Sequence, residues 1–226
     1  MLCVTRTFRN LITSVIRLTA ELALTAGFVL LLFAFYLLVW SNHRTEAAQD
    51  NLLAQFRTEA GKDGPAASKK RLDPGDGVAV LHIPKFGKDW AFVVVEGTDT
   101  DDLRNGPGRF SDSAMPGEVG NFAIAGHRAT HGEPFANLDS VDEGDQIVVE
   151  TGKEWLVYEI TWSRIVAPSA LEVIAPVAGH PGRKPTQSTM TLVTCHPRWG
   201  STERLVVGSQ LVERRKAAAG PPKGVA

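Results

Sequence analysis

The hydrophobic positions divide the chain into one long apolar run near the N-terminus and a series of short apolar runs after residue 77. The long run, residues 22–40, contains no charged residue and no proline. As a helix its 19 residues would extend about 28 Å, close to the roughly 30 Å hydrocarbon core of a bilayer. Cleaved signal sequences have shorter apolar regions, of about 7–15 residues. The pattern therefore predicts an uncleaved transmembrane signal anchor over residues 22–40.

The charges around this run predict its orientation. Arg6, Arg9 and Arg17 precede the apolar residues, whereas Arg44 is the only basic residue shortly after them. Lysine and arginine are retained on the cytoplasmic side of a membrane. We therefore expect residues 1–21 to be a short cytoplasmic N-terminus, with the remainder of the chain outside the cell.

The segment 41–77 separates the apolar run from the first short one. Residues 44–60 are rich in Ala, Glu, Gln and Leu, which favours a helix. Residues 61–77 are polar and punctuated by Gly and Pro, which is typical of a flexible spacer. We expect 41–77 to be a helical, then flexible, extracellular spacer between the membrane and a folded domain.

The rest of the chain predicts a mainly β fold. Short runs of β-branched and aromatic residues are separated by Gly and Pro clusters, and helical stretches such as 99–105 are short. Seven or eight short strands with irregular connections favour a closed or nearly closed β-barrel over residues 78–212, followed by a disordered tail, 213–226. The expected strands cover residues 78–83, 90–96, 121–126, 146–151, 155–166, 189–195 and 204–212.

Composition narrows the function classes. With 226 residues and 43% hydrophobic content the chain can bury one sizeable core, and its net charge of −1 gives no indication of a nucleic-acid partner. The only two cysteines, Cys3 and Cys195, fall on opposite sides of the predicted membrane, so they cannot form an intrachain disulfide. Cys195 is left as a metal ligand, a buried filler or a nucleophile.

The positions of three reactive residues favour the nucleophile. Cys195 ends one expected strand, Arg204 opens the next, and His127 directly follows the expected strand 121–126. Residues at strand ends can meet at one rim of a barrel. A thiolate attacks, an imidazole transfers the proton, and a guanidinium stabilises an oxyanion. The backbone near Thr194 and His196 adds candidate oxyanion or supporting groups.

A metal site is the competing interpretation. His127 and His131 have a spacing that binds metals on a helix, with Cys195 or His196 as a third ligand. Glycines on either side of the two histidines disfavour that helix, so we expect neither a metal nor another cofactor. We further expect the nearby Arg128 and Arg198 to be solvated, or to be weak substrate contacts.

Three stretches of the sequence resemble a known family. The stretch TLVTCHPRWGSTERLVV, 191–207, resembles the Thr-Leu-x-Thr-Cys signature of the sortases, with the family's arginine downstream. The stretch AGHRATHGEPFANLD, 125–139, resembles their histidine segment. The preceding residues from 82 onwards are similar to class E sortases, the housekeeping type of many actinobacteria. The resemblance extends over about residues 78–212.

The resemblance implies an eight-stranded sortase barrel and a cysteine transpeptidase. Cys195 would attack the Thr–Gly bond of a C-terminal sorting signal, Leu-Ala-x-Thr-Gly in preference to Leu-Pro-x-Thr-Gly, on a secreted protein. A peptidoglycan-precursor amine, of the lipid II kind, would then resolve the thioacyl enzyme. His127 would be the general acid–base and Arg204 the oxyanion-stabilising residue. His131, where class E proteins often have tyrosine, is a substrate-binding candidate.

A second hypothesis stays open beside the transpeptidase. A membrane-tethered extracellular binding or metal-binding module could use a sortase-like barrel without turnover. The simultaneous presence of Cys195, His127 and Arg204 favours the enzyme.

Overall fold

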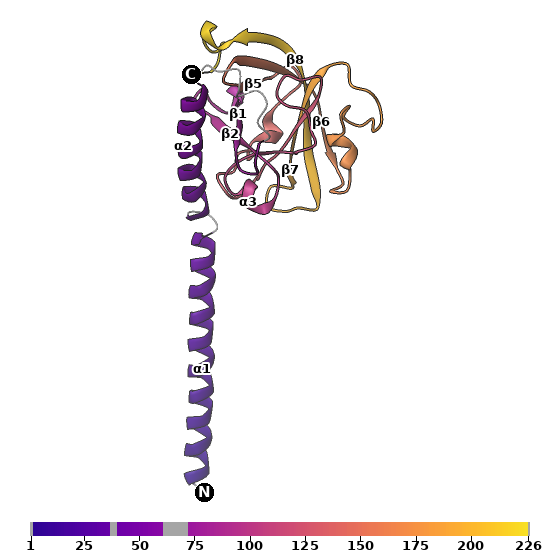
Figure 1. Cartoon of the computed structure of the whole chain (residues 1–226). Helices are drawn as coiled ribbons and strands as arrows, with labels where there is room; N and C mark the ends of the chain where they lie inside the picture. Colours follow the sequence, from indigo (N-terminus) through magenta and orange to yellow (C-terminus); the bar gives the residue numbers. More distant parts are fainter. Residues whose placement is uncertain (1, 37–39, 61–71, 226) are drawn as a thin grey trace. The chain divides into compact units, whose positions relative to one another are not determined.

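The computed structural model describes residues 2–36, 40–60 and 72–225, with side chains from residue 12 onwards except those of 59 and 60. The chain forms two compact units, Met1–Ser41 and Asn42–Ala226. The first unit is dominated by helix α1, Leu2–Phe35 (Figure 1).

Helix α1 contains the apolar segment. Residues Ile12–Phe35 are long and apolar enough to cross a membrane, and none of this segment is buried in the protein. The segment begins earlier than the expected 22–40, because apolar side chains continue back to Ile12 and the only charges within it, Arg17 and Glu21, form an i,i+4 ion pair of 2.9 Å. Residues 37–39 lie outside the described part of the chain. An apolar N-terminal helix of this length fits a membrane anchor.

The second unit is built on a closed eight-stranded β-barrel, which confirms the expected fold (Figure 1). Around the barrel the strands follow the order β1-β2-β3-β4-β7-β8-β6-β5, and β5 pairs with β1 to close it. The strands are β1 Gly77–His82, β2 Ala91–Glu96, β3 Gly108–Arg109, β4 Gly120–Ala125, β5 Gln146–Glu150, β6 Glu154–Val166, β7 Ser188–His196 and β8 Glu203–Lys216.

The barrel interior is a continuous apolar core. Strand residues alternate between its two faces, so the inward positions of β7, Met190 and Leu192, are fully buried. Short helices lie in the connections, η2 Pro84–Phe86, α3 Thr100–Leu103, η3 Leu138–Ser140 and η4 Leu171–Ile174, and η5 Ala217–Ala219 follows the last strand. Phe135 and Leu138, from the β4–β5 connection, also belong to this core.

Strand β3 has only two residues and was not predicted from the sequence. It pairs with β2 on one side and β4 on the other. Arg109 on β3 lies beside Glu96 on β2, and the guanidinium donates two hydrogen bonds, of 2.7 and 2.8 Å, to the carboxylate. Both side chains are buried. This bidentate pair supplies the attachment that two residues of backbone pairing could not provide alone.

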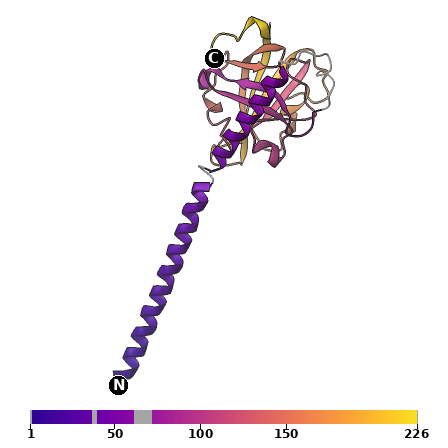
Figure 2. The same ribbon diagram turned by 60° about the vertical axis from the view of Figure 1, so that its left-hand side comes forward.

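Helix α2, Ser41–Ala60, agrees with the helix expected at 44–60 (Figure 2). Its contact with the barrel was not predicted from the sequence. Its side chains are hydrogen-bonded to the barrel unit: Gln49 binds the backbone of Val93 on β2, and the hydroxyl of Thr45 donates to the carbonyl of Arg104. The expected flexible part of the spacer falls largely on residues 61–71, outside the described residues.

The C-terminal segment differs from the expected disordered tail, 213–226. Strand β8 continues to Lys216, and Arg214 lies opposite Leu156 of β6 in the same antiparallel ladder. Beyond the strand, Val225 packs against a second apolar cluster, Val148, Trp155 and Val157. The long β6 strand offers pairing partners past residue 212, which composition alone does not show.

Tyr158 provides a test of the core. Its fully buried hydroxyl accepts a 2.8 Å hydrogen bond from the buried N–H of Gly117, and burial raises the pKa of Tyr158 to about 12. The substitution Tyr158→Phe leaves that N–H without its partner, so we expect a loss of about 1–3 kcal/mol in the free energy of unfolding. Urea unfolding of the full chain followed by tryptophan fluorescence measures this loss. An unchanged midpoint would contradict the structural role of the hydroxyl.

Candidate active site

Strand β7 carries Cys195 near its end, and its pairing with β8 places Arg204 directly opposite. In an antiparallel ladder opposed residues project from the same face, with Cβ atoms about 4.5–5.5 Å apart. The inward faces of these strands hold Leu192 and Leu205, so Cys195 and Arg204 lie on the outer face. Cys195 is a free cysteine and is partly exposed. Cys195 and Arg204 are therefore cross-strand neighbours on the outer face of the barrel.

His127 approaches from the other side of β7. Strand β4 pairs in parallel with β7 up to Ala125 and Val193, and Gly126 continues the contact by donating its N–H to the carbonyl of Val193 at 3.1 Å. The buried hydroxyl of Thr194 donates to the carbonyl of Gly126 at 2.7 Å. Extending this register by two residues brings His127 beside Cys195. The structure thus brings the three predicted catalytic residues to one end of β7.

The environment of His127 keeps its imidazole neutral. Its ring stacks on that of His131, with centroids 4.7 Å apart and planes inclined by 26°. Burial, and to a lesser extent the charge of His131, lower the pKa of His127 from 6.5 to about 4. Burial, followed by the charge of Arg104, also lowers the pKa of His131. At neutral pH His127 is consequently an uncharged base that can accept a proton.

The segment that follows His127 is a strained turn. His131, Gly132 and Glu133 have φ values of 54°, 75° and 48°, all in the left-handed region. For a non-glycine residue this conformation costs about 1–3 kcal/mol. The turn is held by an ion pair of 2.6 Å between Glu133 and Arg198, which joins it to the loop after Cys195. Arg198 was expected to be solvated; it remains partly exposed but is ion-paired.

Arg128 was also expected to be solvated, and the structure corrects this. Only 3% of its side chain is exposed. Its guanidinium donates a 2.9 Å hydrogen bond to Nδ1 of His196 and forms a 2.7 Å ion pair with Asp139. Because a guanidinium has no acceptor, Nδ1 of His196 must be unprotonated. Arg128 therefore ties the histidine segment to the residue after Cys195, and partners from distant segments explain its burial.

Arg204 makes local contacts. Its Nη1 donates to the carbonyls of Ser201 and Glu203, at 2.9 and 2.8 Å. These bonds involve one of the three guanidinium nitrogens and hold it against the backbone at the start of β8. The supporting residues Thr194 and His196 each contact the histidine segment through the bonds described above.

The side-chain contacts between the segment after β4 and the segment after Cys195 were not predicted from the sequence. The available signal was closeness in sequence to the reactive residues, which Arg128, Glu133 and Arg198 share. Their charges suggested a solvated surface, which is the commonest environment for such residues. Only the pairing of β4 with β7 shows that the two loops face each other.

The lowered pKa of His127 predicts a pH-dependent contribution to stability. In the unfolded chain the imidazole titrates near 6.5, so between pH 6.5 and about 4 the unfolded state binds more protons than the folded state. The contribution is therefore complete above pH 6.5 and is lost as the pH falls toward 4. We expect the free energy of unfolding of the native protein to fall more steeply over this window than that of His127→Asn. Urea midpoints of both proteins across the window measure this; parallel curves would contradict it.

Comparison with known proteins identifies the family. Residues 81–212 match the model of the Sortase domain. The chain is 35% identical to Sortase SrtE1 of Streptomyces coelicolor, over 91% of this chain and 60% of that protein, and 34% identical to Sortase SrtE2 of the same organism, over 90% and 85%. The solved sortase E of Streptomyces avermitilis superposes with a TM-score of 0.62 at 36% identity, covering 68% of this chain and 99% of that one. The chain belongs to the sortase family, whose members are cysteine transpeptidases.

Proposed function

We propose that this chain is a membrane-anchored sortase that cleaves the Thr–Gly bond of a C-terminal sorting signal and joins the protein to a peptidoglycan-precursor amine. The observation that carries the proposal is the convergence of Cys195, His127 and Arg204 at one end of β7. Thiol, imidazole and guanidinium are the three groups that acyl transfer through a thioester requires.

In the first step the sulfur of Cys195 attacks the threonine carbonyl while His127 accepts the thiol proton. Arg204 stabilises the oxyanion of the tetrahedral intermediate. The C–N bond then breaks, His127 returns the proton to the leaving glycine amine, and a thioester remains on Cys195. In the second step the acceptor amine attacks the thioester, passes a proton to His127, and leaves as an amide while the thiol is regenerated. The neutral state of His127 supports its role as the initial base.

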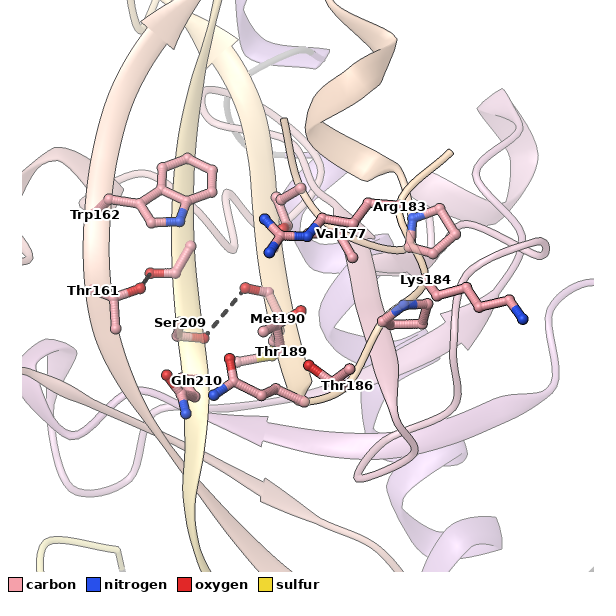
Figure 3. Close-up of a pocket in the computed structure, with 16 residues that line it drawn as sticks. Thr161, Trp162, Val177, Arg183, Lys184, Thr186, Thr189, Met190, Ser209 and Gln210 are labelled. Atoms are coloured by element: carbon pink, nitrogen blue, oxygen red, sulfur yellow. Dashed lines mark hydrogen bonds between the residues drawn. The ribbon is translucent and has the colours of Figure 1, made fainter. Parts of the chain in front are cut away.

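A cavity on the same barrel face supports an extended substrate (Figure 3). It has a volume of about 320 Å³ and is lined partly by Thr189 and Thr191 of β7, which share the outer face with Cys195. Figure 3 shows Trp162 on one side and the guanidinium of Arg183 reaching over the strands. Over the three residues that precede its threonine, a peptide with that threonine at Cys195 would extend about 10 Å, to within one residue of the level of Thr191.

The signal that we propose is Leu-Ala-x-Thr-Gly, with Leu-Pro-x-Thr-Gly as a poorer substrate. The sequence similarity to two relatives named as sortases of the E type supports this preference. His131 would contact the signal, because its ring lies directly against that of His127. The substrates would be secreted proteins, and the acceptor an amine of a lipid II-like precursor.

The proposed location is the cell membrane, with a single pass and the N-terminus in the cytoplasm. The apolar segment Ile12–Phe35 is the anchor. Arg6 and Arg9 precede it, and the catalytic unit follows it, so the retention of positive charge inside supports a barrel outside the cell. This is where both a secreted protein and a wall precursor are accessible.

The reaction is tested with the full chain in detergent micelles and a quenched Leu-Ala-x-Thr-Gly peptide. We expect cleavage that continues in EDTA and is abolished by Cys195→Ala and by thiol alkylation, because the nucleophile is the sulfur. Mass spectrometry of the enzyme trapped with substrate should show a thioester at Cys195 whose mass places the cut between Thr and Gly. Activity lost in EDTA, or no activity at all, would instead favour the metal-binding or non-catalytic alternative, and a mass on another residue would exclude Cys195 as the nucleophile.

Arg204→Lys tests the guanidinium. Lysine keeps the charge but loses the planar arrangement of donors, so we expect the catalytic rate to fall about 100-fold. The matched control is Arg215→Lys on the same strand, whose guanidinium pairs with Glu213 at 3.0 Å. A rate within twofold of the native enzyme in Arg204→Lys would exclude the directional role of the guanidinium and leave only a charge effect.

A further inference from the structure

Helix α2 presents three polar side chains to the barrel unit. Asn42, Thr45 and Gln49 are three and four residues apart, a spacing that places them on one face of a helix. Each of them forms a hydrogen bond with a backbone group of the barrel unit. On the opposite face, Asn51 is exposed. The helix that directly follows the membrane segment in sequence is therefore docked through one specific polar face.

The strongest of these contacts resembles strand pairing. The amide oxygen of Gln49 accepts the N–H of Val93 at 2.6 Å, and its amide nitrogen donates to the carbonyl of Val93 at 3.1 Å. The same nitrogen donates to the carbonyl of Asn105 at 2.6 Å. One side-chain amide thus satisfies both backbone groups of a residue in β2, as the peptide of a neighbouring strand would. These bonds fix both the rotation and the axial position of α2.

The first turn of α2 contacts the strained turn beside the catalytic histidine. The amide oxygen of Asn42 accepts the N–H of Gly132 at 3.0 Å. Thr45 is only 1% exposed, and its side chain lies so close to Gly132 that a Cβ there would come within 2.9 Å of its methyl group. Gly132 is the centre of the three left-handed residues 131–133. A conformation of this kind persists only when its surroundings hold it.

The same turn carries the ring that covers His127. His131 stacks on His127 at a centroid distance of 4.7 Å, and its Nδ1 lies 2.9 Å from the hydroxyl of Thr130. A short chain of direct contacts therefore runs from Asn42 through Gly132 and His131 to the imidazole of His127.

We infer that α2 belongs to the catalytic unit, and that Asn42 and Thr45 are positioning residues that hold the 131–133 turn so that His131 fixes the imidazole of His127. The inference rests on the proposed role of His127 as general acid–base. Loss of the Asn42 bond lets the turn relax, so the two rings separate and His127 gains water and rotational freedom. The part of the substrate groove on the outer face of β7 is not altered directly, whereas the proposed contact of His131 with the signal moves with the turn.

The test compares three variants of the full chain in detergent micelles. Asn42→Leu removes the acceptor at similar volume. Asn42→Asp keeps an acceptor oxygen and is favourable in the first turn of a helix. Asn51→Leu makes the same chemical change on the exposed face. With the quenched Leu-Ala-x-Thr-Gly peptide we expect Asn42→Leu to lower kcat by about tenfold to 100-fold. Asn42→Asp and Asn51→Leu should retain native kcat.

A second measurement determines the pKa of His127, and through it the burial of its ring, in the absence of substrate. In NMR titrations of protein labelled at the histidine ring carbons, we expect the pKa of His127 to rise toward 6.5 in Asn42→Leu, because burial is the main cause of its lowering. It should stay near 4 in the Asn42→Asp and Asn51→Leu proteins. A histidine resonance identical in all four proteins would overturn the inference.

The two arms separate failure of this inference from failure of the proposed function. If the native enzyme does not cleave the peptide, the proposed function fails, while the NMR titration still decides whether α2 controls His127. If the enzyme is active and Asn42→Leu is native in both kcat and pKa, the inference is wrong. Should Asn42→Leu not fold, Thr45→Val, which keeps the volume but loses the bond to the Arg104 carbonyl, replaces it with the same expected direction in both measurements.

Discussion

The register of strand β7 is the constraint on which the site depends. This strand pairs in parallel with β4 and antiparallel with β8, so residues distant in sequence reach its end from both sides. A slip of one residue would turn Cys195 into the core and Met190 or Leu192 out of it. Burial of those two side chains therefore specifies the position of the thiol. The hydrophobic core, although it takes no part in the chemistry, sets the geometry of the reaction.

The ladder between β4 and β7 ends at Ala125 and Val193, two residues before His127 and Cys195, and beyond it side chains hold the two segments together. Arg128 reaches His196, and Glu133 reaches Arg198, so two charge-assisted contacts join the histidine segment to the loop after the thiol. Such contacts are shorter and stronger than neutral hydrogen bonds. Together with the docked first turn of α2 they surround the strained residues 131–133. The active end of the barrel is thus held from three directions, which suits a reaction that requires preorganised groups.

The apolar runs predicted seven of the eight strands, because their alternation with turn residues is a local signal. Strand β3 could not be predicted in this way, because two residues are too few to show an alternation of apolar and polar positions. The strand depends instead on the buried ion pair Glu96–Arg109. The three reactive residues could be predicted from their places at strand ends and from the sortase resemblance. The docked face of α2 could not, because a stripe of Asn, Thr and Gln has the composition of a solvated surface until the fold supplies its partners.

The burial of His127 has opposite effects on its two tasks. A pKa of about 4 makes the imidazolium a strong acid, suited to protonating the leaving amine, but makes the neutral imidazole a weak base toward the thiol. The negative charge that develops on the sulfur and on the oxyanion raises the basicity of the imidazole during the reaction. Opposite charges about 4 Å apart interact by about 4 kcal/mol at an effective dielectric constant of 20. That energy corresponds to about three pH units, comparable with the lowering from 6.5 to about 4. The imidazole therefore becomes an effective base only as the sulfur acquires charge, so proton transfer and attack on the substrate are coupled.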